Sequence, residues 1–426
     1  MPDAGTDVSE EAQKNAFRSL LRRTKKNGLM ITPTHQLALA RLSSLQTILC
    51  CPRTKTELRL VPIEELLSYL SEDERQRMPD GTIGAFISDA ARRAYPLTER
   101  VAYFLEETSL RTCRDRSETV SVTVPATSGD DITQSVRDWY DRFGWKKNKQ
   151  GLYNDSALFS QSRPIGHGLY ELMSHLSILD RLPGGDFVLD AASGAIPHSE
   201  QLAFSWFFKS RVCVDMSITA LLEASMKLRQ MDFCCLADIC RLPYRDDSFD
   251  GAVSGYTIQH IPESLQLAAI KEIFRVIRPN AHLCILTEVK YSVWHKGLFY
   301  LLRAFRKLLK MLHLVSPQIF ASQTEHGRET PPQRLYYFFR SRAWWKKVAG
   351  ELTYRHSVES LRILNKSEFE WLFGQSNRAA KALRLLENAF PRLTSVMSAY
   401  CLIDLCKPER NKLSLQSCQG ESKSEL

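Results

Sequence analysis

Three aspartates stand at the ends of successive short apolar runs in the middle of the chain: Asp190, Asp215 and Asp238. Almost continuously apolar runs are typical of parallel strands buried on both faces, and open α/β sheets bind ligands at the carboxyl ends of such strands. A carboxylate there can accept hydrogen bonds from both hydroxyls of a ribose, although a strand-end aspartate is also often the cap of the next helix. For Asp215 the residue types leave both interpretations open.

Small side chains follow the first of these aspartates, at Ala192, Ser193 and Gly194. They allow a ligand to approach the backbone closely at the turn from strand to helix. The segment does not meet the glycine pattern GxGxxG, because Ala192 and Ile196 occupy positions that could hold glycine. By itself the turn is compatible with a nucleoside site and with an ordinary connection.

Alternating strand and helix patterns surround these residues from Trp139 to about Pro408. Their repetition predicts βα units and a mostly parallel sheet. Helices are expected to open on serine, a favoured N-cap, over Ser199–Phe208, Ser217–Arg229 and Ser264–Ile277. Strands are predicted at Phe187–Ala191, Arg211–Asp215, Phe233–Ala237, Gly251–Ser254, His282–Val289 and Ser398–Cys406.

The segments LDAASGA, VDMS, ADICRLPYRDDSFD and SGYTIQHI follow one another in this order. The ordered set resembles the class I S-adenosylmethionine-dependent methyltransferases, in their small-molecule branch, over about residues 137–408. The resemblance implies an α/β fold with a Rossmann-like seven-stranded sheet, an antiparallel last strand and helices on both faces, and S-adenosylmethionine as the cofactor. A nicotinamide dinucleotide is the rival, but its pyrophosphate needs backbone donors at a glycine-rich helix N-terminus, and Ala192 and Ile196 argue against that.

The resemblance also assigns parts of the cofactor to the matching positions of this chain. The aspartate and glycine of LDAASGA would lie against the methionine part, the aspartate of VDMS would hold the ribose, and Asp238 with Ile239 would contact the adenine. Ser254 and Gly255 would border the sulfonium. The expected cofactor-binding residues are Asp190, Ala192, Ser193, Gly194, Asp215, Met216, Asp238, Ile239, Ser254 and Gly255.

Methyl transfer is an in-line displacement at a carbon that the sulfonium already activates, so the protein mainly aligns the acceptor and excludes water. We expect no metal ion and no covalent nucleophile. An oxygen acceptor would benefit from a base, and Tyr256 and His260 lie on the loop where a substrate would approach. A structural histidine is the alternative for His260.

The sequence SGYTIQHI differs from the Asn/Asp-Pro-Pro-aromatic motif of exocyclic base methylases, and no Pro-Cys nucleophile occurs, so nucleic-acid partners are disfavoured.

Aromatic residues are concentrated ahead of the first predicted strand of this sheet, at Trp139, Tyr140, Phe143, Trp145 and Tyr153. In the family that the chain resembles, such a lead commonly folds over the cofactor. Packing beneath the sheet is the alternative.

Composition divides the chain into five parts: a flexible lead at 1–40, a small domain at 41–108, a linker at 109–134, the catalytic domain at 135–408 and a flexible tail at 409–426. The small domain carries CPRTKTELRLV and FISDAARRAYPLTERVAYFLEE. It resembles the small activator subunit of tRNA and protein methyltransferases in a metal-free form, since only one of the four zinc-binding cysteines of that family is kept. We expect an α+β accessory domain fused in cis.

A basic insert at residues 290–350 holds 12 Lys or Arg against 2 Glu, a net charge of 12 − 2 = +10 where the whole chain has +9. Residues 297–314 within it predict an amphipathic helix, which can lie at an anionic membrane interface or cover a lipid-like substrate. A lid with a solvated basic face is the plainer alternative. The apolar stripe comprises Leu298, Leu301, Leu302, Phe305, Leu308, Leu309 and Leu312.

Composition is that of an ordinary globular protein, with 44% hydrophobic and 25% charged residues in 426. Without a signal peptide or an apolar run of about 18 residues, we expect a cytoplasmic protein, with peripheral membrane contact as an option. Eleven cysteines, several in apolar runs, indicate reduced buried thiols.

The expected function is methyl transfer from S-adenosylmethionine to a small-molecule or lipid-like acceptor. Two alternatives stay open: an RNA or translation-factor methyltransferase, and a cofactor-binding scaffold without catalysis.

Overall fold

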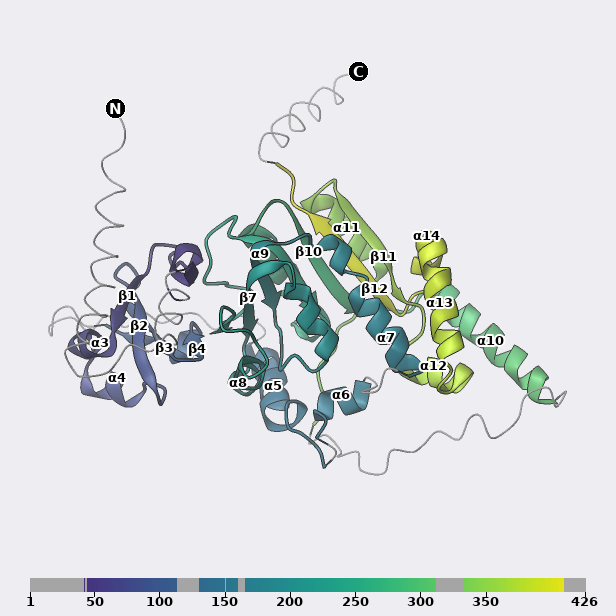
Figure 1. Ribbon diagram of the computed structural model, residues 1–426, viewed down its shortest axis with the longest axis horizontal. Helices are drawn as coiled ribbons and strands as arrows, with labels where there is room; N and C mark the ends of the chain where they lie inside the picture. The colour runs from purple at the N-terminus through teal and green to yellow at the C-terminus, as the bar shows by residue number, and fades with distance from the viewer. Residues whose placement is uncertain are drawn as a thin grey trace, which may run out of the picture.

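The computed structural model describes residues 42, 44–112, 130–149, 151–159, 165–311 and 333–409. Its strands form one sheet that runs through the whole molecule (Figure 1). The strands are β1 Arg59–Pro62, β2 Thr82–Ser88, β3 Arg93–Thr98, β4 Val101–Tyr103, β5 Leu110–Arg111, β6 Gly185–Ala191, β7 Phe208–Asp215, β8 Phe233–Leu236, β9 Phe249–Gly255, β10 Ile277–Glu288, β11 His356–Arg362 and β12 Tyr400–Cys406.

Helices connect and cover these strands. The α-helices are α3 Ile63–Tyr69, α4 Glu72–Gln76, α5 Asp130–Trp139, α6 Asn154–Phe159, α7 His167–Leu176, α8 Ile218–Ser225, α9 Gln266–Val276, α10 Val293–Met311, α11 Arg342–Leu352, α12 Lys366–Phe373, α13 Asn377–Ala389 and α14 Pro391–Val396. Shorter helical turns are η1 Glu106–Thr108, η2 Tyr140–Gly144, η3 Leu179–Arg181, η4 Ser199–Ser205 and η5 Ile258–His260.

The central part of the sheet has the order β8-β7-β6-β9-β10-β12-β11. Strands β6 to β10 pair in parallel, whereas β12 is antiparallel to both of its neighbours, which confirms the predicted antiparallel last strand. All six predicted strands are present. Strand β11 was not predicted, because its sequence HSVESLR mixes polar and apolar residues at the edge of the sheet.

The N-terminal strands correct the expectation of a seven-stranded sheet beside a separate small domain. Strand β4 pairs in parallel with β8, with Val101 opposite Cys234, so that β1 to β4 extend the central sheet and 12 strands form one sheet. One hydrophobic core holds residues of both parts, including Phe86 and Tyr95 together with Phe233. Main-chain pairing at an exposed sheet edge explains the difference, since edge strands present unpaired N–H and C=O groups.

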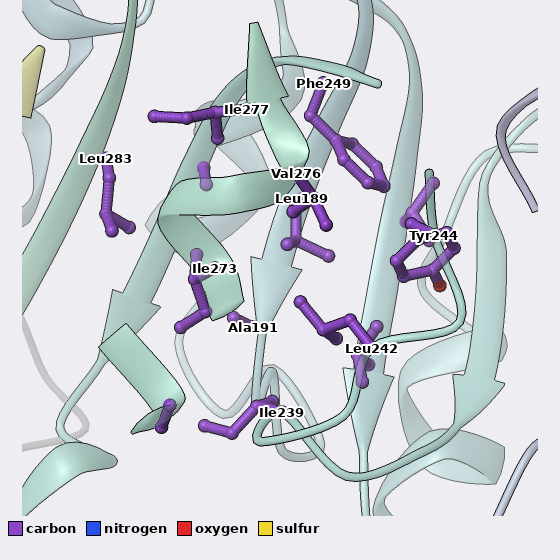
Figure 2. Close-up of a cluster of buried hydrophobic side chains, with 14 of the residues drawn as sticks. Leu189, Ala191, Ile239, Leu242, Tyr244, Phe249, Ile273, Val276, Ile277 and Leu283 are labelled. Carbon is purple, nitrogen blue, oxygen red and sulfur yellow. The ribbon is translucent and has the colours of Figure 1, made fainter. Parts of the chain in front are cut away.

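Helices cover both faces of the sheet, as predicted. Alternation along each strand sends Leu189 and Ala191 to one face, where α9 and α11 pack, and Val188 to the other. Figure 2 shows the first of these clusters, in which Ile273 and Val276 of α9 lie among strand residues. On the opposite face, α8 packs its buried residues against β7 and β8.

Two predicted boundaries change. Residues 130–134, expected in the linker, belong to α5, and Leu110–Arg111 pairs with β3 as strand β5. The predicted amphipathic helix begins earlier than expected, at Val293, and is described as far as Met311. Residues 1–41, 113–129, 312–332 and 410–426 lie outside the described residues. They include the predicted lead at 1–40 and most of the predicted linker at 109–134 and tail at 409–426. In the described part of the chain, no helix is long and apolar enough to span a bilayer.

Candidate active site

A cavity of about 550 Å³ opens at the carboxyl edge of the central strands. The loops after β6, β7, β8 and β9 contribute to it, which is where parallel sheets bind ligands. Both candidate catalytic residues, Tyr256 and His260, line this cavity. Eight of the predicted cofactor residues also line it: Ala192, Ser193, Gly194, Asp215, Met216, Asp238, Ile239 and Gly255.

The other two predicted cofactor residues are not among those that line the cavity. Asp190 is 6% exposed, and its carboxylate accepts a hydrogen bond from Nε of the buried Arg211 at 3.0 Å. Ser254 is fully buried within β9. Strand alternation sends both side chains into the sheet packing instead of the edge. A charged residue inside the apolar run RVCVD was the signal for a buried partner of Asp190.

The turn after β6 follows a left-handed backbone path although two of its residues are not glycine. Ala192 has φ 59°, Gly194 has φ 55° and Ile196 has φ 50°. Left-handed conformations cost L-residues about 1–2 kcal/mol each. The turn therefore keeps a conformation that glycine adopts freely, so the missing glycines do not alter its path.

Asp215 sits at the centre of the cavity edge with both oxygens engaged. Its Oδ2 accepts the N–H of Gly194 at 2.8 Å and its Oδ1 accepts the N–H of Ser217 at 2.8 Å. The hydroxyl of Ser217, and not Asp215, caps α8 by accepting the N–H of Ala220 at 3.0 Å. Each carboxylate oxygen keeps a lone pair for a further donor. Burial raises the pKa of Asp215 to about 6.

Aromatic residues of the segment before β6 cover this edge. The ring of Trp145 lies so close to Gly194 that a Cβ there would stand 2.5 Å from it. Trp145 stacks on Tyr140 with 5.1 Å between ring centroids, and both line the cavity. Trp139 anchors the segment by donating Nε1–H to the carbonyl of Gln333 at 3.1 Å. The aromatic lead therefore folds over the cavity.

The residues on this side fit a nucleoside that bears a short charged chain. A carboxylate at Asp215 suits vicinal hydroxyls, and Ile239 beside Asp238 offers an apolar surface and an acceptor to a purine. At Gly255 a Cβ would meet no atom within 4 Å, so this backbone faces open space. Burial raises the pKa of Asp238.

A polar network forms the opposite side of the cavity, around Tyr256. Its hydroxyl lies 2.9 Å from Nε2 of His175 and accepts Nη2–H of Arg362 at 3.1 Å. His175 Nδ1 lies 3.0 Å from Oε1 of Glu200. With Nδ1–H donating to that carboxylate, Nε2 of His175 is the acceptor for the Tyr256 proton. Burial raises the pKa of Tyr256.

Arg362 and Glu171 complete the network as a buried ion pair that the sequence did not reveal. Nη1 of Arg362 lies 2.7 Å from Oε1 of Glu171, and both side chains line the cavity. Burial alone would raise the pKa of Glu171, but the charge of Arg362 holds it well below its usual range. The guanidinium also stands 4.4 Å from the centroid of the Tyr400 ring. Arg362 ends the unpredicted strand β11, which explains why it was missed.

His260 has one ring nitrogen committed to the chain and lines the cavity with its ring. Nδ1 lies 3.0 Å from the carbonyl of Tyr336, and the ring contacts those of Tyr140 and Tyr337. Burial lowers the pKa of His260 to about 4, so the imidazole is neutral at pH 7. The contact makes His260 a tether for the segment 333–340, whose Tyr337 and Phe339 line the cavity.

Comparison with known proteins agrees with this geometry. Residues 189–285, which run from β6 into β10, match the family described as the methyltransferase domain. The chain is an S-adenosylmethionine-dependent methyltransferase. S-adenosylmethionine is its cofactor, and the side of the cavity at β6, β7 and β8 holds the residues that would bind it.

Curated relatives are named demethylmenaquinone methyltransferase. The protein of Mycobacterium sp. (strain KMS) is 27% identical over 185 residues, covering 41% of this chain and 76% of its own. That of Roseiflexus sp. (strain RS-1) is 24% identical over 148 residues, covering 34% and 59%. Among solved structures, the Haemonchus contortus phosphoethanolamine N-methyltransferase 2 with S-adenosylhomocysteine aligns with TM-score 0.38 and 16% identity, covering 64% of this chain and 60% of that chain, which is less than two thirds of its length.

Proposed function

We propose that the enzyme methylates a lipid-like acceptor whose head group carries an ionisable hydroxyl, as a quinol or phenol does. The observation that carries the proposal is the Tyr256 hydroxyl, which lines the cavity and is bonded to both His175 and Arg362. The curated relatives, named for demethylmenaquinone, support an acceptor of this chemical class.

We infer from the sheet order that the two substrates bind on opposite sides of β6. The residues proposed for the nucleoside follow β7 and β8 on one side of β6. On the other side, Tyr256 follows β9, and Glu288 and Arg362 end β10 and β11. S-adenosylmethionine supplies a methyl group on a sulfonium when bound. An acceptor on the β9 side would therefore face that methyl across the centre of the cavity.

The polar network gives the acceptor proton a route. Oη of Tyr256 accepts the proton of the acceptor hydroxyl while its own proton passes to Nε2 of His175, and Glu200 stabilises the imidazolium through Nδ1–H. Nη2–H of Arg362 donates to Oη of Tyr256 and stabilises the negative charge that develops on that oxygen as its own proton leaves. Loss of the proton makes the acceptor electron-rich at its oxygen and at ring carbons. Either atom would bond to the methyl carbon as the bond from that carbon to sulfur breaks, and S-adenosylhomocysteine would leave. At a ring carbon, the hydrogen already there would then leave as a proton, so that the ring regains its aromaticity.

Aromatic and apolar side chains also line the cavity, including Tyr337, Phe339 and Leu265. These residues exclude water from the displacement. They also suit the ring and the first part of an apolar tail.

The experiment is a transfer assay with methyl-labelled S-adenosylmethionine and acceptors matched in head group. A prenylated demethylmenaquinol, the same naphthoquinol without its tail, bulk RNA and translation factors are compared. We expect label in the two quinols and faster transfer to the prenylated one. Label confined to RNA or protein would overturn the proposal in favour of the macromolecular alternative. Cofactor binding without transfer to any fraction of a cell extract would favour the scaffold.

For the N-terminal strands we propose the activator-like role in cis that the sequence resembles. Its support is the pairing of β4 with β8, continued by the N–H of Phe104 donating to the carbonyl of Leu236 at 2.7 Å, two residues before Asp238. Ala102→Pro removes the N–H of a strand residue of β4. We expect this variant to bind S-adenosylmethionine more weakly at unchanged helix content, and wild-type affinity would refute the role.

A further inference from the structure

We propose that α10 and the basic cavity at its start form a docking surface for an anionic phospholipid bilayer. The inference goes beyond the proposed acceptor and rests on features outside the active-site cavity. It concerns the side of the molecule farthest from the N-terminal strands, where α10 lies beside α12 (Figure 1).

The described inner face of α10 packs against α12; the side chains of Phe305 and Leu309, and Leu312 of the predicted stripe, lie outside the described residues. Leu298, Phe299 and Leu302 join the cluster around α12, and the guanidinium of the buried Arg306 stands 4.2 Å from the centroid of the Trp371 ring. His295 secures the start of the helix through the carbonyl of Met397 and the carboxylate of Glu368. The predicted single apolar stripe is therefore divided, since only part of it is buried.

The outer face of α10 is a second apolar stripe, and it is exposed. Trp294, Leu301 and Leu308 repeat at seven-residue spacing, and Trp294 is 68% and Leu301 67% exposed. Val293, Gly297, Tyr300, Ala304 and Met311 extend the same sector and are also exposed. An exposed apolar stripe with aromatic residues toward one end is the form of a helix that lies in a membrane interface.

The charges beside this stripe have one sign. Lys296, Arg303 and Lys307 form an exposed row next to it, and the sequence holds no Asp or Glu between Glu288 and Glu325. Cations beside an inserted apolar face attract anionic headgroups, and each cation raises the affinity for the membrane about fivefold. Charge complementarity therefore identifies an anionic surface as the occupant.

A basic cavity of about 260 Å³ lies directly before Val293. Its cationic side chains are Lys290, Arg342 and Lys346, and no acidic residue lines it within the described part of the chain. Nε of Arg342 is buried and makes no hydrogen bond there. Burial lowers the pKa of Arg342, which no carboxylate offsets. The cavity is suited to a phosphate, and its position at the foot of the apolar stripe makes that phosphate a lipid headgroup.

Flotation of the full chain with vesicles tests the surface. Vesicles of phosphatidylcholine with one third phosphatidylglycerol should carry the protein at low salt, pure phosphatidylcholine should carry far less, and high salt should release it. Trp294→Ser should lower binding to the anionic vesicles at least tenfold. Trp206→Ser, at a tryptophan 67% exposed beyond η4, is the matched control and should bind as wild type.

The basic cavity is tested by Arg342→Gln, with inorganic phosphate as a second probe. We expect the variant to lose about fivefold in vesicle binding, the value of one cation. If calorimetry shows that Arg342 binds inorganic phosphate while vesicle binding is unchanged in the variant, the lipid assignment is overturned. Equal flotation of wild type and Trp294→Ser also overturns it. Transfer to the tailless quinol reports on the proposed function separately, and neither variant should change it.

Discussion

The hydroxyl of Tyr256 lies 2.9 Å from Nε2 of His175, although the two residues are 81 positions apart in the sequence. Tyr256 takes a left-handed backbone conformation, φ 56°, directly after β9, and this bend directs its ring across the carboxyl edge toward α7. The pair joins the cavity to the carboxylate of Glu200. In the proposed mechanism, this contact gives Tyr256 a route for its own proton when it accepts the proton of an acceptor hydroxyl.

Tyr256→Phe should lower kcat by about 10²–10⁴-fold, the usual contribution of a general base, with little change in the affinity for S-adenosylmethionine. The ring and its packing stay, and only the proton acceptor is lost. Steady-state kinetics and calorimetry measure the two quantities. His175→Gln should lower kcat in the same way, and a variant at either position with wild-type kcat would exclude the relay.

Binding of S-adenosylmethionine should weaken as the pH falls through about 6. Burial raises the pKa of Asp215 to about 6, and only the ionised carboxylate accepts two hydroxyl donors. The raised pKa has the opposite effect on the stability of the protein without cofactor. Between about pH 4 and pH 6 the folded state binds the proton of Asp215 more tightly than the unfolded state does. The free energy of unfolding therefore falls as the pH rises through this range.

Asp215→Asn is the control for that titration. It should weaken binding at pH 8 by about 1.5–3 kcal/mol, the range for hydrogen bonds to a charged group. It should also flatten the dependence on pH near 6. Calorimetric titrations between pH 5 and 8 test both points, and an unchanged profile would assign the titration to another group.

Ala192→Gly should keep the free energy of unfolding unchanged or raise it, by up to about 1.5 kcal/mol. Relief of the left-handed strain, about 1–2 kcal/mol, exceeds or balances the entropy cost of glycine, about 0.5–1 kcal/mol. Ala195→Gly, at a buried residue three positions on that has no positive φ, should instead be destabilising. Urea denaturation compares the two variants, and equal losses would contradict the assignment of strain to Ala192.

Arg362→Met should destabilise the fold by about 3–5 kcal/mol, because the carboxylate of Glu171 would stay buried without its partner. Adding Glu171→Gln removes that charge and should restore most of the stability. The double variant should still turn over slowly, since Tyr256 has lost the donor at 3.1 Å. Recovered stability together with wild-type kcat would show that the pair serves the fold alone.

His260→Ala should lower turnover with little effect on cofactor affinity. The loss frees the carbonyl of Tyr336 and loosens the segment that carries Tyr337 over the cavity. His260→Asn can still donate to that carbonyl. Recovery of turnover in the asparagine variant would establish the tether, whereas equal impairment of both variants would favour a base at Nε2.

Local patterns predicted the strand ends of the nucleoside side, and the family resemblance assigned their residues to the cofactor. Strand β7 is a continuous apolar run that ends in Asp215, and the serine two residues later opens α8, so strand, loop and cap lie within one short stretch. Such segments keep their conformation because the interactions that form them are local. The resemblance also assigned Asp190 and Ser254 to the cofactor, but each side chain points into the sheet packing, and that depends on which partner strand lies opposite.

The sequence did not predict the residues of the proposed acceptor side, for a different reason. Three separate segments carry Glu171, Tyr256 and Arg362, at separations of 256 − 171 = 85 and 362 − 256 = 106 positions. They meet because β11 pairs with β12 and lies at the edge of the sheet near α7. Strand β11 has little apolar alternation, since pairing with β12 stabilises it more than its own composition does.

The amino-acid sequence by itself determined a parallel α/β sheet, the positions of its buried strands and a carboxylate at the end of the second of them, because apolar periodicity and capping act over a few residues. The tertiary structure alone decided that the N-terminal strands extend this sheet, that Arg362 faces Tyr256, and that one stripe of α10 stays exposed. Those outcomes depend on strand pairing and burial between segments that are distant in the sequence. Such contacts form and contribute to stability only in the folded chain.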